Sequence, residues 1–150
     1  MLKKTIKYTN VLGEEATTTA YFNINNVEYL RLAAKFGQEG DLVKGIRGAV
    51  ESGDVNKMIS TIEEFILSAY GIRPSEDLAG FIKTDAARNL FASSEPYSEL
   101  FMELLNNPES LEEFVSSLVS GVKLNPQVPM QTLKDKANSM TQQAIMNPLA

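Results

Sequence analysis

The sequence predicts an α+β protein that is mainly helical, with an N-terminal β-hairpin, a bundle of about five to six helices and an extended C-terminal tail. Three observations support this fold class. Polar and apolar side chains alternate over residues 2–9 and 15–24, apolar residues recur every three or four positions from 26 to 120, and prolines and polar residues dominate after 121. We therefore predict one domain over residues 1–121, with the hairpin at 2–24 and the helices at 26–120, followed by a polar tail at 122–150.

The two alternating runs are rich in β-branched and aromatic residues, which favour strands. Ile6 and Tyr8 share one face of the first run, and Phe22 and Ile24 share one face of the second. The residues between the runs, Asn10-Val11-Leu12-Gly13, have the composition of a turn, and Gly13 can adopt a positive φ. Because a lone hairpin is only marginally stable in water, it must pack on helices or add its edge to a neighbouring subunit.

Capping residues and glycines divide the middle of the chain into three helices. Asn25 or Asn26 begins a helix that extends to about Phe36, a second helix covers about 41–52, and Asp54 begins the strongest helix, about 55–70. The apolar stripes that we expect to face the core include Val27, Leu30, Ala33 and Ala34 in the first helix and Val55, Met58, Ile59, Ile62, Phe65 and Ile66 in the third. Gly45 and Gly48 lie inside the second helix, where each costs about 1 kcal/mol relative to Ala unless it permits close helix contact.

Three more helices are predicted at 85–92, 95–105 and 108–120, with Thr84, Ser94 and Asn107 as their caps. Leu90 and Phe91 belong to the apolar face of the first of them. The second carries apolar residues at 97, 100, 101, 104 and 105, which form one stripe of an amphipathic helix. Leu100 and Leu104 lie at the centre of this stripe and are expected to be internal. Tyr97, Phe101, Met102 and Leu105 lie toward its margins and are expected to form its outer edge.

The charge and composition exclude several classes of function. The chain has a net charge of −5 and a sequence pI of about 4.8, which argues against a nucleic-acid partner. It contains no Cys and no His, so it lacks thiolate metal ligands, a cysteine nucleophile and the usual general base near neutral pH. No apolar run reaches the length of a membrane span, and no apolar region follows Lys3 and Lys4 as it would in a signal peptide. We therefore expect a cytosolic protein.

The remaining candidates for chemistry are four acidic pairs, Glu14-Glu15, Glu63-Glu64, Glu76-Asp77 and Glu112-Glu113. Two carboxylates can perform acid–base catalysis, but each pair lies on a predicted turn, connector or polar helix face, which favours a solvated surface. The sequence lacks a phosphate-binding loop, a nucleophile elbow and a calcium loop. It therefore predicts no catalytic residues, no cofactor and no metal site, and we expect that the protein is not an enzyme.

The C-terminal tail differs from the rest of the chain in charge. Residues 1–120 carry 11 basic and 18 acidic side chains, net −7, whereas residues 121–150 carry three lysines and one aspartate, net +2. A weak helix is predicted at 130–146, with apolar residues Met130, Leu133, Ala137, Met140, Ala144 and Ile145. Flexible methionines on such a helix suit an adaptable interface, and a solvated tail without function is the equally weighted alternative.

Three motifs together resemble a known family. The order Phe65-Ile66-Leu67-Ser68-Ala69-Tyr70-Gly71, then Phe81-Ile82-Lys83, then Tyr97-Ser98-Glu99-Leu100-Phe101-Met102-Glu103-Leu104 is similar to the small tail assembly chaperones of long-tailed phages and prophages of Gram-positive bacteria. The hairpin, with Lys3-Lys4-Thr5-Ile6-Lys7-Tyr8 and Tyr21-Phe22-Asn23-Ile24, extends the resemblance to about residues 2–119. The sequence departs from the family at Leu78-Ala79-Gly80 and at the apolar turn Val11-Leu12-Gly13.

The resemblance implies a non-enzymatic helper that coats the tape measure protein, keeps its apolar helices soluble, helps recruit tail tube protein, and leaves before the virion is complete. It places the protein in the host cytoplasm. We expect the partner to bind in an apolar groove between the helices at 55–70 and 97–105. The residues expected at the rim of this groove or near it are Phe81, Ile82, Tyr97, Phe101, Met102 and Leu105.

Two other functions stay open at this point. The first is a structural component of the phage tail, such as a connector or terminator subunit, and the second is a small enzyme that uses carboxylates alone. The hairpin edge and the tail are candidates for self-assembly into a homo-oligomer around the partner.

Overall fold

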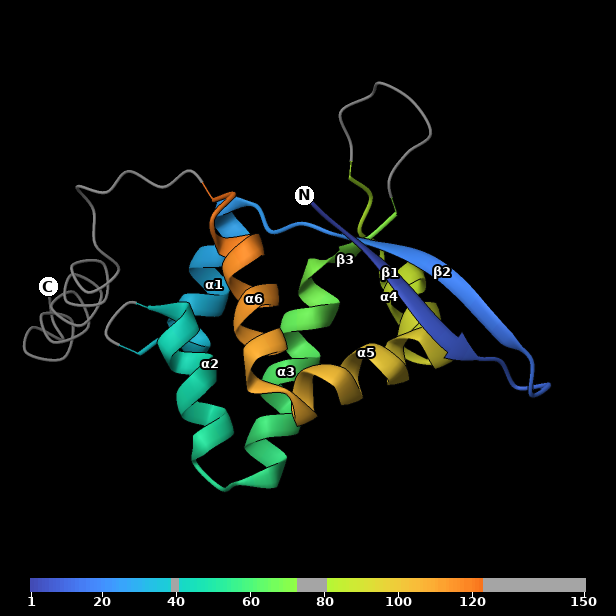
Figure 1. The fold of residues 1–150 in the computed structure, drawn as a ribbon. Coiled ribbons are helices and arrows are strands. Elements are labelled where there is room, and N and C mark those ends of the chain that lie inside the picture. The colour runs from blue at the N-terminus through green and yellow to red at the C-terminus, as the bar shows by residue number, and fades with distance from the viewer. Residues whose placement is uncertain (39–40, 73–80, 123–150) are drawn as a thin grey trace, which may run out of the picture.

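The computed structural model describes residues 1–38, 41–72 and 81–122 and confirms the predicted fold class (Figure 1). Within these residues an N-terminal hairpin precedes six helices, and a short third strand follows the third helix. The predicted C-terminal tail lies outside the described residues after Val122. In chain order the elements are β1 (Leu2–Thr9), β2 (Glu15–Phe22), α1 (Asn26–Phe36), α2 (Leu42–Glu51), α3 (Val55–Ala69), β3 (Tyr70–Gly71), α4 (Asp85–Ala92), α5 (Glu95–Asn106) and α6 (Pro108–Val119).

The hairpin pairs β1 and β2 in antiparallel register, from Leu2 opposite Phe22 to Thr9 opposite Glu15. Strand β3 was not predicted. It pairs antiparallel with the end of β2 and completes a sheet of order β1-β2-β3. Tyr70 was predicted as the last residue of the preceding helix, but that helix ends at Ala69. A two-residue strand that depends on a partner about 50 residues away leaves no periodic signal in the sequence.

The turn of the hairpin is held by hydrogen bonds to Asn10. Asn10 Oδ1 accepts from the backbone N–H groups of Leu12 and Glu14, each at 2.9 Å. Gly13 has a φ of 86°, and its N–H donates to the carbonyl oxygen of Asn10 at 2.9 Å. The turn, at the far end of the hairpin in Figure 1, therefore holds its shape, and its residues Val11 and Leu12 have 85% and 79% of their surface exposed.

The helices begin at the residues that the caps predict. Asn25, rather than Asn26, caps α1, and Glu28 completes a capping box with it. Asp54, Thr84, Ser94 and Asn107 each accept a hydrogen bond from the first turn of the helix that follows. Asp41 does the same for α2.

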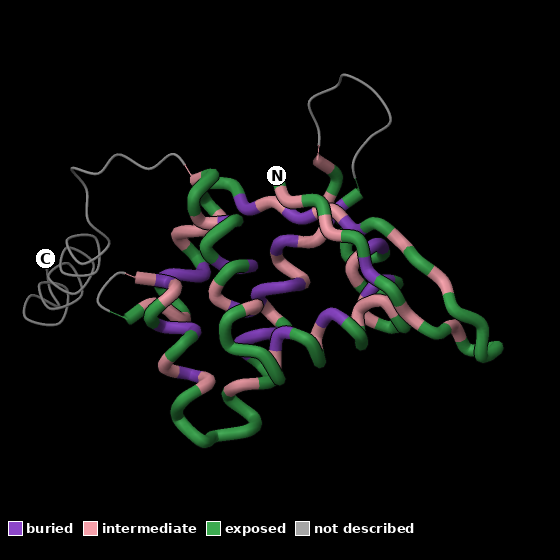
Figure 2. Tube along the Cα trace, viewed as in Figure 1, coloured by how far each residue is buried: buried purple, intermediate pink, exposed green. Residues whose placement is uncertain are grey.

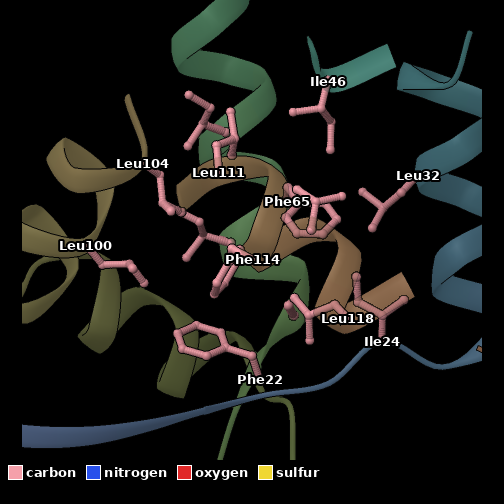
Figure 3. Packing of buried hydrophobic residues seen from close by; sticks show 14 of the residues in the cluster. Phe22, Ile24, Leu32, Ile46, Phe65, Leu100, Leu104, Leu111, Phe114 and Leu118 are labelled. Carbon is pink, nitrogen blue, oxygen red and sulfur yellow. The ribbon is translucent and has the colours of Figure 1, made fainter. Parts of the chain in front are cut away.

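The core lies between the base of the hairpin and the six described helices, each of which contributes buried residues, as the buried segments in Figure 2 show. Phe114 is at its centre, with its ring centroid 5.2 Å from that of Phe22 and 6.0 Å from that of Phe65. Figure 3 shows side chains from β2, α1, α2, α3, α5 and α6 converging on this point. As predicted, Leu100 and Leu104 of α5 are fully buried.

Gly45 lets α2 approach the end of α1. A Cβ at this position would overlap the carbonyl oxygen of Phe36 and lie 2.6 Å from its carbonyl carbon. Only glycine therefore fits there without displacing the backbone of α1. A glycine inside α2 was expected to be costly unless it permits close contact between helices, and the structure shows such a contact at Gly45.

Several apolar residues that were predicted to face the core are exposed instead. Val27 of α1 is 56% exposed and Leu90 of α4 is 75% exposed, whereas their neighbours Leu32 and Phe91 are buried. The apolar positions of α1 and α4 span more of the helix surface than the neighbouring elements cover. Among the described helices, none is long and apolar enough to span a membrane.

Candidate partner-binding surface

Helix α5 contacts β1 on one side and α3, α4 and α6 on the others. Leu100 and Leu104 point into the core, and the ammonium group of Lys4 on β1 lies 3.3 Å from Oε1 of Glu103. These contacts fix the rotation of α5 about its axis. The side chains on its remaining surface are therefore presented in a defined orientation.

The outer edge of α5 consists of Tyr97, Phe101, Met102 and Leu105. Tyr97, Phe101 and Leu105 are spaced four residues apart, half-buried, and packed against the core cluster. Met102 lies further out and is 46% exposed. The structure thus places these four predicted site residues together on one helix, at the boundary between core and solvent.

An aromatic chain connects this edge to the core. The ring centroid of Tyr97 lies 5.5 Å from that of Phe91 and 6.0 Å from that of Phe101. Phe91 stacks on Tyr70 at 4.0 Å and contacts Phe22 edge-on at 6.1 Å. Burial, with a smaller contribution from the nearby charge of Glu63, raises the pKa of Tyr97 to about 12. Tyr97 and Phe101 therefore stabilise the fold as well as forming surface.

Phe81 and Ile82 occupy a different place, next to β3. Ile82 exchanges two backbone hydrogen bonds with Ile72, at 2.7 and 3.0 Å, and both side chains are about half exposed. The ring of Phe81 lies against Gly71, and the ammonium group of Lys83 lies 5.8 Å from the ring centroid. In Figure 1 the segment that leads into α4 passes beside β3, whereas α5 runs below the hairpin. The six predicted residues thus form two separate groups.

Two apolar residues of α3, a helix that packs against α5, are also exposed. Val55 is 58% exposed and Ile59 is 38% exposed. They precede Glu63 by two turns and one turn on the same face of α3, and Glu63 is the residue whose charge acts on Tyr97. Sequence reasoning assigned both to the core. Their exposure could have been expected from the sequence, because the apolar residues of α3 span more of the helix surface than one buried face requires.

Two of the four acidic pairs that were considered for catalysis each contribute one carboxylate to a contact between helices, and Glu14-Glu15 lies at the start of β2. Lys35 of α1 lies 2.7 Å from Oε2 of Glu64, and Arg47 of α2 pairs with Glu112 of α6. Glu76-Asp77 lies outside the described residues. In the described part of the chain, no three acidic side chains converge in a way that could hold a metal ion. What this geometry offers is an apolar surface with carboxylates around it.

Comparison with known protein families decides the class of protein. The profile of the phage tail assembly chaperone family matches residues 1–145. The chain belongs to this family. Curated proteins and solved structures yielded no match.

For this tail assembly chaperone, the extent of the family match bears on the C-terminal tail. The sequence motifs support a resemblance only over about residues 2–119, whereas the family profile continues to residue 145. The matched region therefore includes the hairpin, all the described helices and most of the segment after Val122. That segment is part of what the chaperone shares with its family.

Proposed function

We propose that this chaperone binds the tape measure protein of its phage, shields the apolar helices of that protein from water, and helps recruit tail tube protein. It acts in the host cytoplasm during assembly, without catalysis, and is absent from the mature virion. The observation that carries the proposal is the outer edge of α5, a row of apolar side chains at the surface of a protein that belongs to an assembly chaperone family.

The outer edge of α5 suits an amphipathic helix as its partner. Its residues are spaced one turn apart, so they match the apolar stripe of a helix laid alongside. Met102 adds a flexible side chain that adapts to different partner sequences. Val55 and Ile59 enlarge the apolar area, and each side chain that becomes fully buried contributes roughly 1.5–3 kcal/mol.

The charges around this surface complete the mechanism. Glu99 and Glu103 lie on the polar side of α5. Glu63 belongs to α3, and its charge acts on Tyr97 of α5. With a net charge of −5, chaperone molecules that coat one long partner present acidic surfaces to each other and to solvent. The complex therefore stays soluble while its apolar helices are covered.

Co-expression with the tape measure protein tests the proposal. The wild-type chaperone should keep that protein in the soluble fraction and co-elute with it in size exclusion. The double variant Met102→Lys with Ile59→Lys places charges on the proposed surface and should lose both effects.

The matched control is Leu90→Lys with Val27→Lys, which puts the same two charges on apolar residues of α4 and α1 that are 75% and 56% exposed and lie outside the proposed surface. It should behave as the wild type. If the tape measure protein is insoluble with the wild-type chaperone, the proposed function is wrong. If both variants work equally well, the proposed surface is wrong.

The alternative role is that of a structural connector or terminator subunit of the phage tail. The protein composition of purified virions distinguishes it from the chaperone role. Mass spectrometry of purified particles should not detect a chaperone. A structural subunit should be present at a fixed copy number.

A further inference from the structure

An apolar groove lies between α2 and α6. Val43 and Val50 line it from α2, and Pro108 and Leu111 line it from α6. Its volume is about 190 Å³. This is below the roughly 300–1,000 Å³ of small-molecule sites, so a row of peptide side chains suits it better than an organic ligand.

The rim of the groove is charged. Arg47 of α2 and Glu112 of α6 form an ion pair, and Glu51 adds a second carboxylate on the α2 side. With two carboxylates and one guanidinium, the rim has a net negative charge, so an occupant should be apolar along its centre and positively charged beside its apolar stripe.

The chain contains a segment with this pattern outside the described residues. From 130 to 144, the apolar residues Met130, Leu133, Ala137, Met140 and Ala144 are spaced alternately by three and four positions. This is the spacing of a helix that packs into a seam between other helices. On a helical repeat of about 100° per residue, Lys134 and Lys136 fall on opposite flanks of the stripe and Asp135 falls on the face away from it.

Chain length and connectivity allow this segment to reach the groove. Helix α6 forms one wall of the groove, and its 12 residues span about 18 Å. The segment follows α6 directly, and residues 123–129 can extend over about 23 Å. This reach is sufficient for the chain to reverse and for residues 130–146 to run back along α6.

We propose that the α2–α6 groove is the docking site of the chain's own segment 130–146. The apolar stripe fills the groove, and Lys134 and Lys136 lie over the carboxylates of Glu51 and Glu112. The docked segment keeps this apolar surface covered in the free chaperone. The proposal does not depend on the identity of the partner at α5.

Paramagnetic relaxation in the full-length chain tests this docking. The chain has no Cys, so Asn138→Cys, on the face of the segment away from the apolar stripe, provides a unique site for a nitroxide label that leaves the stripe intact. Methyl signals of Val43, Val50 and Leu111 should lose most of their intensity relative to a sample in which the nitroxide is reduced. The methyl signals of Val11, at the tip of the hairpin, should keep theirs.

A charge-matched pair of variants sharpens the test. Lys134→Gln with Lys136→Gln lowers the net charge by two on the flanks of the stripe, and should restore much of the intensity of the groove signals. Ser139→Glu with Gln142→Glu lowers it by the same amount on the opposite face, and should leave the broadening unchanged.

A mixed sample identifies whose segment occupies the groove. It combines an isotope-labelled chain without nitroxide and an unlabelled chain with nitroxide. Groove signals that broaden in this mixed sample would assign the groove to the segment of a second copy and overturn docking within one chain, because the observed chain itself carries no nitroxide. Groove signals that keep full intensity in both samples would overturn the proposal altogether.

Discussion

The ammonium group of Lys83 lies 2.6 Å from Oε1 and 2.7 Å from Oε2 of Glu28, and only 11% and 19% of the two side chains are exposed. Lys83 also donates to the carbonyl oxygens of Asn23 and Ser68, at 2.6 and 2.7 Å. Glu28 in turn accepts from the N–H of Asn25 in the capping box of α1. One buried cation thus joins the end of β2, the start of α1 and the end of α3.

Lys83→Met should destabilise the protein by about 3 kcal/mol, because it leaves the Glu28 carboxylate and two carbonyl oxygens without their donor. Burial lowers the pKa of Lys83 despite the opposing effect of Glu28, in agreement with the largely dry environment of this group. Urea unfolding of both proteins near neutral pH measures the difference.

The same substitution at an exposed ion pair is the control. Lys35 pairs with Glu64, but 59% and 40% of the two side chains are exposed. Lys35→Met should cost less than about 1 kcal/mol. Equal losses in the two variants would contradict a special role for the buried cation.

Two glycines of α2 should respond in opposite ways to replacement by alanine. Gly45→Ala should destabilise by more than about 2 kcal/mol, because the new Cβ overlaps the backbone of Phe36, which cannot move without shifting α1. At Gly48 the nearest atom is the end of the flexible Gln38 side chain, 3.1 Å from the new Cβ. Gly48→Ala should therefore be neutral or stabilise by up to about 1 kcal/mol, since alanine favours the helix. Thermal unfolding of the two variants checks the order.

Tyr97 should make the protein less stable at alkaline pH. Its pKa is raised from the usual value near 10 to about 12, so the folded state holds the phenol proton more tightly than the unfolded state does. Stability from this group is fully present below pH 10 and is lost as the pH rises toward 12. The loss should be about 1 kcal/mol, less than the full shift implies, because the ring is only half-buried and solvent screens it.

Tyr97→Phe should remove this part of the pH dependence. Lys83, Tyr29 and Tyr70 also titrate at high pH, but they are present in both proteins, so the difference between the two unfolding curves isolates Tyr97. Denaturant unfolding at about pH 9 and about pH 11 provides the measurement. Parallel losses in both proteins would show that the Tyr97 phenol has no special environment.

The elements that the sequence predicts well depend on local signals. Ser94, Thr84 and Asn107 begin their helices because the capping side chain and the N–H groups it satisfies lie within a few residues. Strand β3 was missed because its partner lies about 50 residues away. Val27 and Leu90 were placed in the core because an apolar stripe identifies a helix face but not the element that covers it.

The same distinction applies to the candidate surface. The angular position of Leu100 and Met102 on one helix predicts which is internal and which is external, and the structure agrees. The grouping of Phe81 and Ile82 with α5 was a guess about three-dimensional proximity. The structure places them beside β3, because backbone hydrogen bonds tie Ile82 to Ile72.

The tip of the hairpin should promote self-association without stabilising the fold. Val11 and Leu12 project from a turn whose shape depends on Asn10 and Gly13, and they are among the most exposed apolar residues described. Within the described residues, β2 pairs with β3 only at Tyr21 and Phe22, so the rest of this edge can add to a neighbouring sheet. The double variant Val11→Asn with Leu12→Asn should change the free energy of unfolding by less than about 0.5 kcal/mol.

The same double variant should lower the sedimentation coefficient measured at high protein concentration. Leu90→Asn, at an exposed apolar residue of α4, should leave this coefficient unchanged. A wild-type chain that sediments as a monomer at these concentrations would remove the basis for self-assembly through the hairpin, and equal effects of the two variants would show that general surface hydrophobicity is the cause.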